Sequence, residues 1–159
     1  MNIGYSTEFE GEFRVNKKVD KKTYDLLVGL ATTRRMKRAG LDPEIYGIEG
    51  EFYVEEDNDT PESRYTPKQG KIVDVNEPPK TQPGLWCQWE IQGDKQTIEW
   101  DGGEKFHNYI EWIKYIVSRI LKPKGYVLNG AVRWRGDDFG DVGSIFVKDN
   151  EITIAPGSF

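Results

Sequence analysis

Residues 5–15 alternate between apolar and polar side chains with the period of a β-strand. Tyr5, Phe9, Phe13 and Val15 fall on one face, whereas glutamate and arginine dominate the other. Because successive side chains of a strand point to opposite sides, this pattern predicts a strand with one buried and one solvated face. The chain must therefore build a sheet whose apolar side is covered by other elements.

Later segments repeat the strand pattern and place turns between the runs. Residues 85–91 alternate again, and a turn at residues 93–95 leads into residues 96–100, which predicts an antiparallel hairpin. Three more strands are predicted near the end of the chain, at residues 126–135, 143–148 and 151–155. Short strands joined by hairpin turns favour a largely antiparallel β-sheet.

Two segments have the apolar period of helices that cover such a sheet. The first begins at an Asp20 cap and closes at residues 34–40, where cations and a final glycine suit a helix C-terminus. The second occupies residues 104–121 behind a capping pair of Asp101 and Glu104, and it carries a wide apolar stripe. We therefore expect an α+β fold with two main α-helices packed on one face of the sheet.

A long Pro-rich loop excursion, residues 41–84, lies between the first helix and the hairpin and holds six of the eight prolines. Two strands are predicted inside it, at residues 51–54 and 71–75, and an acidic run occupies residues 55–59. A loop of this length is either functional or mobile. The 159 residues are predicted to form a single domain that includes the excursion.

The composition excludes several classes of function. A net charge of −5 argues against affinity for duplex nucleic acid, which needs a basic face. No apolar run reaches the roughly 20 residues of a membrane span, and the first residues lack the pattern of a signal peptide. One cysteine and one histidine exclude a Cys/His zinc site within one chain and fit a reducing cytoplasm. No P-loop or dinucleotide fingerprint is present, so no cofactor is expected.

The sharpest charge feature is a basic cluster formed by Arg34, Arg35, Lys37 and Arg38. Arginine forks bind phosphate and carboxylate groups bidentately, so the cluster is a candidate clamp for such a ligand. It equally suits a helix C-terminus, where cations complement the helix dipole and anions are repelled. Both interpretations stay open.

All five tryptophans lie between residues 86 and 134. Trp86 shares its strand face with Gln88 and Glu90, and Trp112 lies off the apolar stripe of its helix, so both are candidates for exposure. An exposed indole stacks on a base or anchors a protein partner. The alternative is that the excursion covers both rings.

Three carboxylates cluster where a strand meets a helix: Glu99, Asp101 and Glu104. They form an alternative, acidic site for a carboxylate-dependent enzyme. His107 is the only imidazole and has no evident nucleophile as a partner, and Cys87 falls on the apolar face of its strand. The acidic runs at residues 55–59 and 137–141 lack the spacing of a calcium loop, so no metal site is predicted.

Three motifs are distinctive: PGLWCQW at residues 83–89, WDGGEKF at residues 100–106 and GYVLNG at residues 125–130. Together with Gly4-Tyr5, Glu8-Phe9 and the basic cluster, they resemble a family of small proteins found in tailed bacteriophages, prophages and scattered bacteria. The match covers nearly the whole chain. The resemblance implies a context rather than a chemistry, namely a phage or mobile-element product that acts in the bacterial cytoplasm.

Three hypotheses about function follow. The first is a non-catalytic binding protein that engages a host protein or sequesters a small nucleotide or other phosphorylated ligand, with a role in blunting host defence. An oligomer is compatible with it. The second is a small carboxylate-dependent hydrolase or nucleic-acid-processing enzyme, and the third is a minor virion component. The tryptophan-rich half, the basic cluster and the missing catalytic constellation favour the first.

Overall fold

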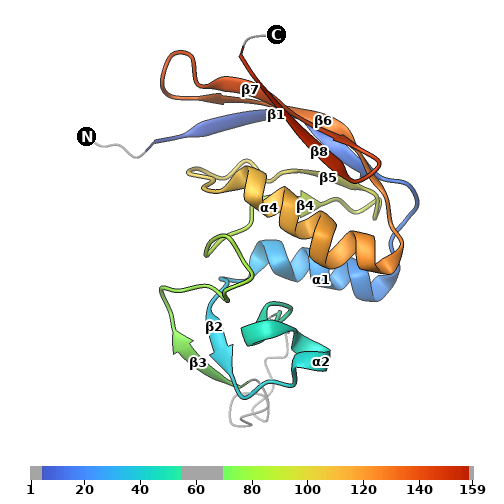
Figure 1. The fold of residues 1–159 in the computed structure, drawn as a ribbon, viewed down its shortest axis with the longest axis vertical. Helices are drawn as coiled ribbons and strands as arrows, with labels where there is room; N and C mark the ends of the chain where they lie inside the picture. Colours follow the sequence, from blue (N-terminus) through green and yellow to red (C-terminus); the bar gives the residue numbers. More distant parts are fainter. Residues whose placement is uncertain (1–4, 55–69, 158–159) are drawn as a thin grey trace.

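The computed structural model describes residues 5–54 and 70–157. Its main feature is a six-stranded antiparallel sheet with the strand order β4-β5-β1-β6-β7-β8. The strands are β1 (Thr7–Val15), β4 (Trp89–Ile91), β5 (Thr97–Trp100), β6 (Leu128–Gly136), β7 (Val142–Lys148) and β8 (Glu151–Pro156). Figure 1 shows this sheet at the top, the main helices beneath it and the described part of the excursion at the bottom. The α+β class and the largely antiparallel sheet are confirmed.

β1 lies inside the sheet, between β5 and β6. Phe9, Phe13 and Val15 are buried on one face, in agreement with the predicted alternation. β1 pairs with β6 along its whole length, with Phe13 opposite Gly130. A Cβ atom on Gly130 would lie 2.4 Å from the carbonyl oxygen of Glu12, so the close approach of the two strands requires glycine there.

Two helices lie on the same side of the sheet (Figure 1). α1 (Lys21–Thr32) begins at the predicted cap, where the Asp20 carboxylate accepts the Thr23 N–H at 2.7 Å. α4 (Tyr109–Tyr115) continues through the π-helical η3 (Ile116–Leu121) into the short η4 (Lys122–Lys124). Both helices contribute buried side chains to the hydrophobic core, among them Leu27, Leu30, Ile113, Ile116 and Ile120.

The first helix ends earlier than the sequence predicts. The Thr33 N–H bonds to the Gly29 carbonyl, and the chain then leaves α1 in an extended conformation. The cations and the glycine at residues 34–40 therefore follow the helix, and the strand β2 (Lys37–Ala39) forms among them. The prediction of a helical turn at these residues is wrong.

The second helix begins later than the sequence predicts. The Asp101 carboxylate accepts the Gly103 N–H at 2.7 Å in a local turn, so it caps no helix. α4 starts at Tyr109, after Asn108 in a left-handed conformation. The predicted start at residue 104 is wrong because the local turn satisfies the same acceptor that a capping box would use.

The described part of the excursion folds below the helices (Figure 1). β2 pairs with β3 (Lys71–Asp74) in a two-stranded antiparallel sheet. α2 (Pro43–Tyr46) and η1 (Ile48–Gly50) lie between β2 and residues 51–54, which form turns instead of the predicted strand. The predicted strand at residues 85–91 shrinks to β4. The acidic run at residues 55–59 lies outside the described residues.

Candidate functional site

Arg35 lies inside the fold, where α1 meets the excursion, and is only 2 % exposed. It donates to the carbonyl oxygens of Glu51 at 2.8 Å and Tyr53 at 2.7 Å, and to the amide oxygen of Gln82 at 3.4 Å. Burial lowers the pKa of Arg35 to about 10, so the side chain stays charged at neutral pH. Arg35 thus donates hydrogen bonds to backbone carbonyls that would otherwise need the N–H groups of a neighbouring strand.

The other members of the basic cluster also turn toward the excursion. Arg34 donates to a backbone carbonyl just after β3 at 2.9 Å. Lys37 pairs with Glu49 at 3.4 Å. The buried Arg38 places its guanidinium over the Tyr53 ring, 3.7 Å from the centroid. A clamp for a ligand would need its guanidinium groups at the surface, but Arg35 and Arg38 are buried, because the cluster holds the excursion against the rest of the fold.

Glu51 is the centre of a polar network at this junction. Its side chain is fully buried and accepts two hydrogen bonds from Arg119, whose side chain is 40 % exposed. The Tyr115 hydroxyl donates to Glu51 at 2.9 Å and the Ile48 N–H at 2.8 Å. Burial acts to raise the pKa of Glu51, but the hydrogen bonds from Arg119, Ile48 and Tyr115 outweigh it and hold the pKa below its ordinary value. Glu51 is therefore ionised at neutral pH and fixes the Arg119 guanidinium.

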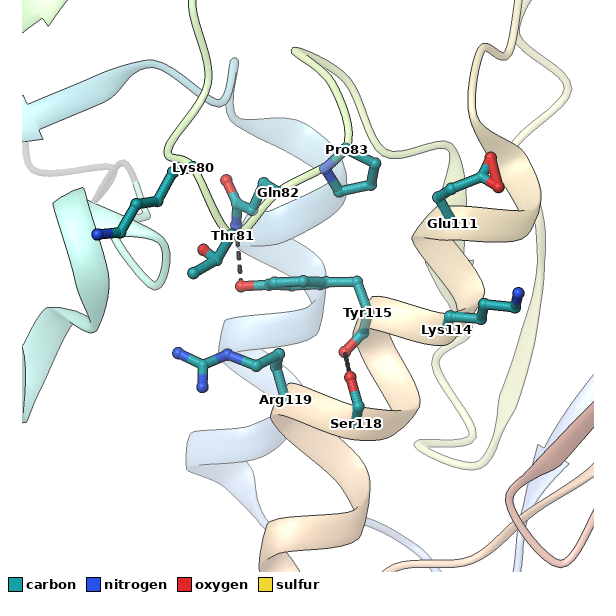
Figure 2. A pocket seen from close by; sticks show the side chains of 9 residues that line it. All are labelled: Lys80, Thr81, Gln82, Pro83, Glu111, Lys114, Tyr115, Ser118 and Arg119. Carbon is teal, nitrogen blue, oxygen red and sulfur yellow. Dashed lines mark hydrogen bonds between the residues drawn. The ribbon is translucent and has the colours of Figure 1, made fainter.

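Gln82 joins this network to Arg35. Its amide nitrogen donates to the Glu51 carbonyl at 2.7 Å. It also donates to the Tyr115 hydroxyl oxygen at 3.1 Å, the bond that Figure 2 shows as a dashed line. Burial raises the pKa of Tyr115, so its hydroxyl keeps the proton that it donates to Glu51. Buried hydrogen bonds therefore connect both described parts of the excursion, residues 41–54 and residues 70–84, to α4.

A hollow of about 490 Å³ opens next to the network, between residues 80–83 and the outer side of α4 and η3. Figure 2 shows Lys80 and Arg119 extending to one side of Tyr115, and Glu111 and Lys114 to the other. The charged groups of this smaller hollow thus spread outward instead of converging on one point.

A larger hollow of about 780 Å³ shares Arg119 with the smaller one and lies between the start of α1, α2 and η4. Its cations are Lys21, Lys22, Lys124 and Arg119, and its carboxylates are Asp25 and Glu44. Its apolar lining consists of Leu26, Ile45, Tyr46, Phe52, Val54 and Pro123. The larger hollow therefore combines an excess of positive charge with apolar and aromatic surface.

The larger hollow has a basic end and an aromatic end. The Lys124 ammonium donates to the Thr23 hydroxyl at 3.2 Å, which places it beside the first turn of α1 and hence near Lys22. At the other end, the Phe52 N–H bonds to the Tyr46 carbonyl at 2.9 Å. The lysines therefore come from α1 and η4, and the two rings from α2 and the residues after η1, whereas the Arg119 guanidinium lies 6.0 Å from the centroid of the Phe52 ring.

The two candidate tryptophans differ in exposure. Trp86 is 45 % exposed, which agrees with its interpretation as a candidate for exposure and not with cover by the excursion. Trp112 is fully buried, and its indole N–H has no hydrogen-bond partner among residues 5–54 and 70–157. For Trp112 the interpretation as an exposed ring is wrong and the alternative holds, because the end of the excursion covers it. A Cβ atom on Gly84 would lie only 3.6 Å from the indole nitrogen.

The alternative acidic site is spread over a strand and a turn. Glu99 lies in β5, and the backbone carbonyl of the exposed Glu104 accepts a hydrogen bond from Gln88 at 3.0 Å. No carboxylate of this set lines either hollow. Within the described part of the chain, no group of three or more His, Cys, Asp or Glu residues is placed to hold a metal ion. His107 is exposed and Cys87 is buried.

Sequence reasoning missed Glu51 and Arg119, the pair at the centre of the site. The signal was present in their neighbours, because Glu51 precedes Phe52 and Tyr53, and Arg119 interrupts a run of isoleucine, valine and leucine. A charged residue inside an apolar run is rarely buried unless it is paired. Both residues could therefore have been predicted to have a partner of opposite charge. Only the fold identifies that partner.

Comparison with known protein families, with curated proteins and with solved structures found no match. Among the residues that the structure describes, no helix combines the length and the apolar character needed to cross a membrane. The geometry of the two hollows is therefore the guide to function.

Proposed function

We propose that this chain is a non-catalytic binding protein of phage or mobile-element origin. It holds a small phosphorylated ligand in the cytoplasm of a bacterial host and so withholds that ligand from a host defence. The observation that carries the proposal is the larger hollow, which gathers four cations in a protein whose net charge is −5.

Charge and size both suit such a ligand. Lysine and arginine are the side chains that hold phosphate groups, and converging positive charge raises the local concentration of an anion at the mouth of a cleft. The volume of about 780 Å³ lies within the range of roughly 300–1,000 Å³ typical of small-molecule sites.

The Arg119 guanidinium is already fixed in position and keeps one nitrogen free for an anion. Its bonds to the buried Glu51 use Nε and Nη2, so Nη1 stays available to a ligand, without a hydrogen bond to any described residue. The residue also lies in the π-helical η3, and π-helical turns occur frequently at functional sites. A guanidinium already fixed in position loses little side-chain entropy when a ligand binds.

The state of the reactive side chains favours binding over catalysis. Cys87 is buried, and burial raises its pKa to about 12, so the thiolate needed for nucleophilic attack is scarce. Glu99, Asp101 and Glu104 lie outside both hollows. A carboxylate-dependent enzyme would need these groups beside a space for its substrate.

Isothermal titration calorimetry of the full chain tests the proposal, with pyrophosphate, ribose 5-phosphate, AMP and ATP as ligands. We expect binding that weakens as salt is added and is lost in a Lys22→Glu/Lys124→Glu variant. A Lys114→Glu/Lys148→Glu variant has the same net charge outside the larger hollow and should bind like the wild type. The proposal fails if none of the four compounds binds, or if both variants bind equally well.

A second candidate function, engagement of a host protein, is favoured by two exposed aromatic side chains. Trp86 is nearly half exposed, and Phe139 is fully exposed at the tip of the β6–β7 hairpin. Asp141 accepts hydrogen bonds from Tyr5 and Trp134, which brace that tip. Exposed, preorganised aromatic groups are common anchors in protein interfaces. If Phe139→Ser and Trp86→Ser variants recover the same host proteins as the wild type from infected cells, this function is excluded.

A further inference from the structure

On the basis of the proposed function, we infer that the larger hollow takes a nucleoside phosphate. The base lies against Tyr46 and Phe52, and the phosphate lies among Lys22, Lys124 and Arg119. Three features of the lining support a ligand that carries both a base and a phosphate.

The first feature is the aromatic end. Tyr46 and Phe52 are partly buried neighbours joined by a backbone hydrogen bond of 2.9 Å, and the Arg119 guanidinium lies 6.0 Å from the centroid of the Phe52 ring. Nucleobases stack on aromatic rings and on guanidinium planes. Ile45, which is 65 % exposed, adds apolar surface to the same end. A ligand without an aromatic base would leave this surface in water.

The second feature is the basic end. Lys22 makes no hydrogen bond or ion pair with any residue of the described ranges, and Lys124 is bound only to the neutral Thr23 hydroxyl. Lys21 differs, because it pairs with Asp25 at 2.6 Å. Neither ammonium group forms an ion pair with a described residue, although both lie close enough to the Asp20 carboxylate to help lower its pKa. Two such groups on different elements suit the concentrated charge of a phosphate.

The third feature is Glu44, a carboxylate in a lining that is otherwise basic. Its side chain makes no hydrogen bond or ion pair with the part of the chain that the structure describes, whereas Asp25 is neutralised by Lys21. Glu44 repels a bare phosphate. It accepts hydrogen bonds from ribose hydroxyls or from an exocyclic amino group, the donors that a nucleoside adds.

The closing experiment compares AMP, ribose 5-phosphate, adenosine and pyrophosphate by calorimetry on the wild-type full chain. We expect AMP to bind at least about tenfold more tightly than ribose 5-phosphate, because stacking of one base contributes a factor of that order. Equal affinities for AMP and ribose 5-phosphate would overturn the nucleoside inference and leave the proposed function standing. Absence of binding by every phosphorylated compound would remove both.

Variants locate the base and the phosphate separately. Phe52→Leu and Tyr46→Leu keep apolar volume but remove a flat ring, so each should weaken AMP binding by about tenfold and leave ribose 5-phosphate binding unchanged. Lys22→Glu should weaken both ligands and spare adenosine. Phe146→Leu, on an exposed position of β7, is the matched control. If the Leu variants weaken the binding of AMP and of ribose 5-phosphate equally, the inference that the base stacks on these rings is overturned. If one Leu variant fails to fold, the other Leu variant and the comparison of AMP with ribose 5-phosphate on the wild type still test whether a base is bound.

Discussion

Replacement of Arg119 by leucine tests whether the Glu51–Arg119 pair stabilises the fold. The substitution removes both hydrogen bonds that Arg119 gives to Glu51. The carboxylate keeps the Tyr115 hydroxyl at 2.9 Å and the Ile48 N–H at 2.8 Å, but it loses its ion-pair partner, and the positive charge of Arg35 nearby reaches it only without a salt bridge. The variant therefore measures the cost of a buried carboxylate that has lost its ion-pair partner.

The magnitude follows from the burial of the two partners. Removal of one member of a fully buried pair costs about 3–5 kcal/mol. Here Arg119 is 40 % exposed and two other donors stay in place, so we expect a loss of about 2–3 kcal/mol in the free energy of unfolding. Glu51→Gln leaves a cation that reaches water and should cost about 1 kcal/mol. The double variant should be more stable than the sum of the two losses predicts.

Urea denaturation across a pH series checks this expectation. The depressed pKa of Glu51 stabilises the wild type above the unfolded value of about 4.3, and this contribution is lost as the pH falls through the folded value. Without Arg119, burial raises the pKa instead, so the ionised carboxylate destabilises the variant at neutral pH. The deficit of Arg119→Leu should therefore shrink as the pH falls toward about 4. A deficit below about 1 kcal/mol, or one independent of pH, refutes the reasoning.

Three further predictions concern other parts of the fold. Cys87, with its pKa raised to about 12, should resist iodoacetamide in the native protein and react in guanidinium, as mass spectrometry would show. Gly29→Ala, normally stabilising in a helix, should lower the free energy of unfolding by about 1–2 kcal/mol. Its Cβ would lie 2.2 Å from a Val54 methyl carbon and 2.4 Å from the Val54 Cβ, so adding Val54→Gly, which removes both atoms, should restore part of the stability, whereas Val54→Ala should not. Phe139→Ser should change stability by less than about 0.5 kcal/mol, and a larger loss would show a hidden contact.

Most strands of the six-stranded sheet were predictable because their signals are local. The alternation in β1 depends only on neighbouring residues, and one buried face follows from it. The turn between β7 and β8 is equally local, because Asp149 and Asn150 adopt positive φ values of 49° and 72°, which a two-residue hairpin favours. Elements whose residues satisfy one another within a few positions are thus read directly from the sequence.

The helix ends and the excursion were not predictable, because distant residues decide them. The cations after α1 have the composition of a helix C-terminus, yet Arg35 binds the carbonyls of Glu51 and Tyr53, far along the chain. The same bonds replace the strand pairing that residues 51–54 would otherwise need. The sequence pattern shows that Arg35 is a cation near a helix, but it does not indicate which distant carbonyls Arg35 binds.

The basic cluster and the larger hollow are connected through the excursion. Arg35 and Arg38 hold Glu51 and Tyr53 in place, and Phe52 between them reaches the aromatic end of the hollow. An Arg35→Ala variant would therefore lose ligand binding by displacing Phe52, even though Arg35 itself lines neither hollow. Loss of binding in that variant would therefore not show that the Arg35 guanidinium contacts the ligand. Lys22, exposed and without a structural partner in the described chain, separates recognition from folding.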